Sequence, residues 1–195
     1  WKWNTDGPDP EDESVCPPRR GKMMIVGGVT NPYEKPYDTD NVTEIINLDD
    51  PTSNCNVPPA YPSRAYTVHA GILDSKAIFC AKPANDDLRK CFQYTTQGFT
   101  EFATLNVADS SASTVVYKDF EEHLWISGGY GAKNMSQFVS STGIISEGPT
   151  MPQELIGHCV VTINKTTSLI IGGINGINAT DKTHWYDFEL AQWID

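Results

Sequence analysis

A short apolar run that ends in two small residues recurs along this chain and constrains its fold more than any other feature. Three copies end in paired glycines, at 22–28, 123–129 and 168–173. A degenerate copy at 76–81 has Cys80 and Ala81 where the glycines would be. The copies recur about every fifty residues, which is the spacing of a protein built from repeated supersecondary units.

Each copy has further strand-like segments around it. The segments 65–72, 113–117 and 158–163 precede the last three copies, and each copy is followed by a polar loop and an aromatic-bearing segment. In the fourth unit Tyr186 is followed by Trp193, and Phe138 and Ile145 hold the same offset in the third. No helical stripe of useful length appears. The pattern predicts four-stranded antiparallel sheets whose short central strands are buried on both faces.

An apolar run, Gly-Gly, a loop, Tyr, six residues and Trp together resemble the kelch motif. The match is strongest over 170–193, fair over 124–145 and 23–55, and weak over 77–102. The linking segments 148–152 and 158–160 resemble those of secreted animal kelch proteins. The resemblance implies an all-β, kelch-type β-propeller, a fold that hosts oxidases, mutarotases, adaptors and scaffolds and therefore does not fix a function.

The repeats divide the chain into an N-terminal segment and a series of propeller blades. Residues 1–20 are expected to hold an outer strand and a linker, and 21–195 the blades, at about 21–60, 61–108, 109–150 and 151–195. The kelch resemblance implies more blades than the four that are visible. We expect the chain to be part of a larger propeller, to be completed by another chain, or to close as an unusually small propeller. The start at Trp1 is no signal peptide and indicates processing or a piece of something longer.

Four Asn-X-Ser/Thr triplets predict N-glycosylation on exposed loops of an extracellular, secreted protein. Their asparagines are Asn41, Asn134, Asn164 and Asn178. In the predicted blades Asn41, Asn134 and Asn178 fall between the second and third strands, and Asn164 between the first and second. Glycans at the first three would crowd one face, so we expect a partner on the opposite face or the outer rim.

The five cysteines fit the same compartment. Cys80 ends one predicted strand and Cys91 begins the next, so a hairpin would bring them together as a disulfide. Cys159 lies in an apolar segment, where we expect it to be buried. A pairing of Cys16 with Cys55 stays open. The absence of any C-x-x-C pair argues against zinc ribbons and thioredoxin-like redox chemistry.

No set of residues in the sequence assembles a catalytic constellation, a metal centre or a cofactor site. His69 and His158 fall at comparable inner-strand positions and could both approach a central channel, although we interpret them as core or channel-lining residues. The acidic stretches 38–41 and 49–50 are interpreted as solvated loops rather than Ca²⁺ sites. We therefore expect no cofactor and no metal.

Charge and hydrophobicity narrow the range of partners. The formal net charge of -11 disfavours nucleic acid and anionic lipid surfaces, and no apolar run is long enough to span a membrane. The sequence favours a non-enzymatic extracellular glycoprotein that presents propeller loops to a protein or glycan partner, including other subunits of one assembly. The alternative is a carbohydrate-active or copper-oxidase-like enzyme with its site at the propeller axis around His69 and His158.

Overall fold

The computed structural model describes residues 22–31, 38–48, 58–83, 89–106, 112–130 and 133–194. The predicted N-terminal segment 1–20, Cys16, Cys55 and the acidic pair 49–50 lie outside these ranges. The described residues form strands and turns without a helix, so the all-β prediction is confirmed, and no helix among them is long and apolar enough to cross a membrane.

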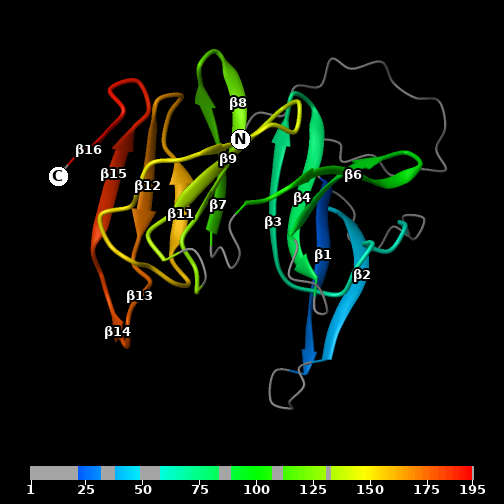
Figure 1. The fold of residues 1–195 in the computed structure, drawn as a ribbon. Helices are drawn as coiled ribbons and strands as arrows, with labels where there is room; N and C mark the ends of the chain where they lie inside the picture. The colour runs from blue at the N-terminus through cyan, green and yellow to red at the C-terminus, as the bar shows by residue number, and fades with distance from the viewer. Residues whose placement is uncertain are drawn as a thin grey trace.

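The strands form three four-stranded antiparallel sheets and two hairpins (Figure 1). The first sheet is the hairpin β1–β2, the second is β3–β4–β5–β6, the third is β7–β8–β9–β10, and the fourth is β11–β12–β15–β16. The small hairpin β13–β14 connects β12 to β15. The strand bounds are β1 (Lys22–Asn31), β2 (Asp38–Asn47), β3 (Ala65–Leu73), β4 (Lys76–Pro83), β5 (Lys90–Thr95), β6 (Gly98–Thr104), β7 (Ala112–Lys118), β8 (Glu121–Ser127), β9 (Ser136–Ser140), β10 (Ile145–Glu147), β11 (Cys159–Thr162), β12 (Thr167–Ile171), β13 (Ile174–Asn175), β14 (Asn178–Ala179), β15 (Thr183–Asp187) and β16 (Gln192–Ile194).

The sheets stand one behind another in chain order, and three hydrophobic cores fill the spaces between them. Figure 1 shows the β1–β2 hairpin at one end of this series and the fourth sheet at the other. Tyr61 and Phe79 lie in the core between the first and second sheets, Ile78 and Leu124 between the second and third, and Trp125 between the third and fourth. The cores therefore lie between sheets rather than within any one of them.

The central strand β8 shows why these apolar runs lack alternation. Successive side chains of a strand point to opposite faces, so Leu124 and Ile126 pack toward the second sheet while Trp125 packs toward the fourth. All three are buried. A strand buried on both faces must be apolar at every position, as the sequence predicts.

The paired glycines end the central strands with the same backbone geometry in two sheets. Gly128 and Gly129 have φ of 61° and 111°, and Gly172 and Gly173 have 61° and 106°. Only glycine adopts such angles at little cost. A Cβ on Gly128 would also lie 2.6 Å from His158 Cε1, and one on Gly173 would lie 2.9 Å from His158 Cβ. The glycines thus allow the linker before β11 to pass close to both sheets.

The strand register corrects the alignment expected for the second repeat. The turns after Leu73 and Lys118 pair Leu73 with Lys76 and Lys118 with Glu121. Counted from these turns, the pair Cys80–Cys91 takes the place of Trp125–Phe138, and not the place of the glycine pair. The reason is the length of the strand. Counted from its turn, β4 continues to Pro83 and so extends further than β8, which leaves Cys80 and Ala81 inside the strand rather than at its end.

Two finer expectations are also corrected. Tyr186 pairs with Trp193 across β15 and β16, and the equivalent pair in the third sheet is Val139 with Ile145, whereas the sequence pattern suggested Phe138. Cys159 is exposed rather than buried. It pairs with Ile171 on the face of the fourth sheet that points away from the third, because strand alternation directs Val160 into the core instead.

Gly71 sets the approach of the second sheet to the third. A Cβ at this position would lie 2.6 Å from Val115 Cγ2 and 2.8 Å from Leu124 Cδ1. Any side chain here would push β3 away from β7 and β8.

We predict that Gly71→Ala lowers the free energy of unfolding by about 1–3 kcal/mol, because it overpacks a close sheet-to-sheet contact. Val115→Ala removes the nearest methyl group, so the double variant should lose less than the sum of the single losses, by roughly 1 kcal/mol. Urea denaturation of the four proteins measures this coupling. Strictly additive losses would contradict the contact.

Candidate functional site

A buried polar site surrounds His158, in the linker that leads into β11. Its imidazole lies between the glycine pairs of the third and fourth sheets. His158 Nε2 and Ser127 Oγ lie 2.8 Å apart and share a hydrogen bond, and both side chains are buried. The linker is fixed on either side, since Gly129 N donates to Leu155 O and Ile156 exchanges backbone hydrogen bonds with Ile174.

The surroundings of His158 favour its neutral form. Burial, and to a lesser degree the charge of nearby His69, lowers the pKa of His158 from 6.5 to about 4. Its Nδ1 has no hydrogen-bond partner among the described residues, so a second N–H on the ring would be left unsatisfied. The geometry is that of a neutral histidine that joins two sheets.

His69 and His158 were predicted to lie at comparable inner positions, and they lie within electrostatic range of each other. His69 is buried in β3. The other two histidines lie elsewhere: His123 contacts the ring of Phe138, and His184 Nε2 lies 3.0 Å from Gln153 Nε2. No three His, Cys, Asp or Glu side chains within the described ranges gather in a group that could hold a metal ion.

The sequon asparagines occupy two kinds of position. Asn164 and Asn178 are exposed, in the β11–β12 turn and in β14. Asn41 and Asn134 are half-buried, and Asn41 lies within β2 rather than in the loop that was expected. Their carbonyls accept equivalent hydrogen bonds of 2.8 Å from the linkers, Asn41 from Tyr61 N and Asn134 from Met151 N.

The Asn164 side chain is held by its own turn. Its Oδ1 accepts hydrogen bonds from the backbone N–H groups of Thr166 and Thr167, at 2.8 and 2.9 Å, and from the Thr166 hydroxyl at 3.2 Å. Oδ1 is thereby occupied by the turn. Because the residue is exposed, this sequon is well presented to an enzyme that modifies it.

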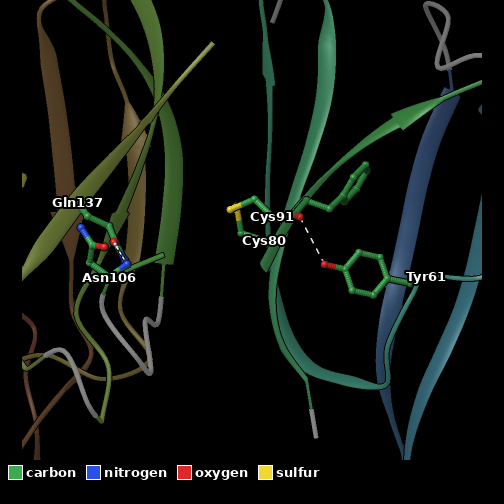
Figure 2. The surroundings of a disulfide bond; sticks show 6 residues. Tyr61, Cys80, Cys91, Asn106 and Gln137 are labelled. Atoms are coloured by element: carbon green, nitrogen blue, oxygen red, sulfur yellow. Dashed lines mark hydrogen bonds between the residues drawn. A yellow bond between two sulfur atoms is a disulfide. The ribbon is translucent and has the colours of Figure 1, made fainter. Parts of the chain in front are cut away.

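Cys80 and Cys91 form the predicted disulfide, which joins neighbouring strands β4 and β5 (Figure 2). Both cysteines are buried in the core between the second and third sheets. Figure 2 also shows Tyr61 pointing toward this region from the linker, where its hydroxyl donates to Phe79 O at 3.4 Å. On the side of the third sheet, Asn106 N donates to Gln137 Oε1 at 3.1 Å.

A groove of about 470 Å³, which was not predicted from the sequence, lies where the β7–β8 and β11–β12 hairpins meet. Tyr117, Glu122, Asn164 and Lys165 line it. Lys165 Nζ lies 5.4 Å from the centre of the Tyr117 ring. Phe120, at the neighbouring turn, is 93% exposed and has φ of 68°. A bulky residue with positive φ is uncommon, and the two-residue turn Asp119–Phe120 between apolar strands was the available signal.

No protein-family model matches this chain, and none of the curated proteins matches it either. The site must therefore be interpreted from its own geometry. That geometry comprises a buried His–Ser contact between sheets, a buried disulfide, two exposed sequons, and an aromatic groove at one set of turns.

Neutral His158 should make stability depend on pH. Because its pKa is lowered by folding, its contribution is fully present above pH 6.5 and is lost as the pH falls toward 4. Relative to His158→Gln, we predict that the free energy of unfolding falls by about 3 kcal/mol over this interval. Urea denaturation between pH 4 and 8 measures it, and the carboxylates common to both proteins cancel. Parallel pH profiles for the two proteins would refute the burial of a neutral ring.

The disulfide should stabilise the fold by restricting the unfolded chain. Replacing both Cys80 and Cys91 by alanine is predicted to lower the free energy of unfolding by about 3 kcal/mol. The control is Ile177→Ala, at a 95% exposed position, which should change stability by less than about 0.5 kcal/mol. Equal effects of the two changes in denaturant titrations would be inconsistent with this role.

Proposed function

We propose that this chain is an extracellular, N-glycosylated and non-enzymatic module of a kelch-type β-propeller, which presents its loops to a protein or glycan partner. The observation that carries the proposal is the disulfide between Cys80 and Cys91 in the core between two sheets. A bridge buried on both strands forms as the protein folds, and such bridges persist in oxidising, extracellular compartments.

The order of the sheets supports the propeller. Consecutive four-stranded meanders stack face to face, and the first strands of neighbouring sheets, β3, β7 and β11, lie next to one another. Between β7 and β11, the hydroxyls of Thr114 and Thr162 lie 3.0 Å apart. Adjacent first strands with sheets radiating from them are typical of propeller blades around an axis.

The exposed sequons support an extracellular glycoprotein. Asn178 lies in the β13–β14 hairpin, on the connection between second and third strands, and Asn164 lies at the turn between first and second strands. Glycans at these two sites would project from opposite ends of the fourth sheet. The turns of the second and third sheets at the Asn164 end would then stay open to a partner.

The groove beside Tyr117 is the surface that best fits such a partner. It offers an aromatic ring, the Glu122 carboxylate and the Lys165 ammonium group, beside the exposed ring of Phe120. Aromatic faces combined with a few polar groups bind both sugars and protein side chains. The groove lies away from the sequon in the β13–β14 hairpin, and Asn164 is part of its lining. A glycan at Asn164 would therefore border the groove and form part of the surface that a partner meets.

The proposal is tested by the intact mass of protein secreted from a eukaryotic host. We expect a glycan at Asn164, so Thr166→Ala should remove the mass of one glycan. The neighbouring change Thr167→Ala leaves the triplet intact and should retain it. Alkylation without reductant should leave Cys80 and Cys91 unmodified. A folded protein without glycan and with both thiols reactive would overturn the extracellular assignment.

A further inference from the structure

The fourth sheet has an outer face that no described part of the chain covers. Its inner face packs on the third sheet through Val160, Ile170 and Tyr186, so strand alternation directs the other set of side chains outward. Ile171, Trp185 and Ile194 of this set are 41%, 39% and 42% exposed. The outward positions are Cys159, Val161, Leu169, Ile171, Trp185 and Ile194.

The equivalent face of the third sheet is buried against a neighbour. The cross-strand pair Trp125–Phe138 of the third sheet is equivalent to the pair Leu169–Trp185 of the fourth. Trp125 and Phe138 are both fully buried. The full equivalent set is Ala112, Thr114, Trp125, Ser127, Phe138 and Ser146.

Comparison of the two faces shows that the uncovered one is the more apolar. The third sheet has hydroxyl side chains at three positions where the fourth sheet has Val161, Ile171 and Ile194. A sheet that ends a stack of repeats carries a polar outer face, because that face meets water. The fourth sheet lacks this adaptation, so its outer face is built to be covered.

The first sheet has an outer face of the opposite kind, and none of the described residues covers it. Met23 and Ile25 are 44% and 42% exposed, while Met24 between them packs toward the second sheet. Ile46 and Glu44 are their cross-strand partners.

This second face also has a buried equivalent in the third sheet. The positions of Met23, Ile25, Ile46 and Glu44 correspond to Leu124, Ile126, Val139 and Gln137, which face the second sheet. Gln137 accepts a hydrogen bond from Asn106, in the segment after the preceding sheet, and the Glu44 carboxylate retains an acceptor there. One end of the chain thus offers the face that receives a following sheet, and the other offers the face that receives a preceding one.

We infer that a second copy of this chain covers both faces, with the fourth sheet of each copy packed on the first sheet of the other. The two faces differ and are complementary in the way that successive sheets within the chain are, which makes the contact head-to-tail. Two such contacts close a ring with two-fold symmetry. The four stacked sheets described in each copy make eight in two copies, which is within the range of blades that propellers have. This inference rests on the proposed propeller architecture.

The experiment measures the native mass of the secreted glycoprotein by sedimentation equilibrium. We expect a native mass of twice the protomer mass. Ile25→Asp disables one face and Trp185→Asp the other, so each variant alone should be a monomer. An equimolar mixture should regain dimers, because the intact first-sheet face of one variant meets the intact fourth-sheet face of the other. Ile177→Asp, at a 95% exposed position on neither face, is the matched control and should remain dimeric.

Circular dichroism of every variant separates loss of association from loss of folding. A wild-type monomer at all concentrations would overturn the inference, and so would a dimer abolished by only one of the two substitutions, which indicates a face packed on its own copy. Glycan mass and thiol reactivity of the same samples report separately on the extracellular assignment. A monomer that is glycosylated and disulfide-bonded would therefore refute the ring alone.

Discussion

The central strands β4 and β8 are apolar on both faces, and the rest of the structure depends on covering both of those faces. A four-stranded sheet built around such a strand cannot bury it alone, because each sheet has two sides and no helix lies against either among the described residues. Trp125 illustrates the size of the requirement: it is fully buried, and removing a side chain of this kind from a core costs about 3–5 kcal/mol. Each sheet must therefore pack against another sheet on both of its faces.

The close stacking of the sheets also requires glycine at certain positions, because a side chain there would collide with the neighbouring sheet or linker. Gly71 lets β3 approach the third sheet, and Gly128 and Gly173 let the linker bring His158 between two sheets. His158 then fills that narrow space with a ring that hydrogen-bonds Ser127 and stays neutral. The histidine that looked like a candidate ligand is thus explained by packing. The groove beside Tyr117 lies at the turns instead, where the strands have ended and side chains are free to contact other molecules.

The periodic apolar runs were enough to predict an all-β chain of four-stranded antiparallel sheets, because a strand buried on two faces has a distinctive composition. They were not enough to fix the register. Cys80 and Ala81 resembled a glycine pair only because both residues are small. The facing of Cys80 and Cys91 was predicted, but the strand register was needed to show that this pair takes the position of an aromatic pair. Exposure of Cys159 was missed for a related reason, since an apolar strand at the end of the stack has the same composition as one inside it. The groove beside Tyr117 is formed by side chains from two sheets, so no single segment of the sequence predicts it.

The exchange of an aromatic pair for a disulfide shows how one repeat position can stabilise a sheet in two ways. In the third sheet Trp125 and Phe138 fill the space in front of the fourth sheet with large rings. In the second sheet Cys80 and Cys91 occupy the same cross-strand position and contribute far less volume to the core. Leu124, Ile126 and Val139 from the third sheet reach into that space, so the layers still meet. The covalent bond then supplies, through the entropy of the unfolded chain, stability that the third sheet obtains from buried area. This substitution works only where the bridge stays oxidised, so the second sheet ties the stability of the stack to the compartment in which the protein folds.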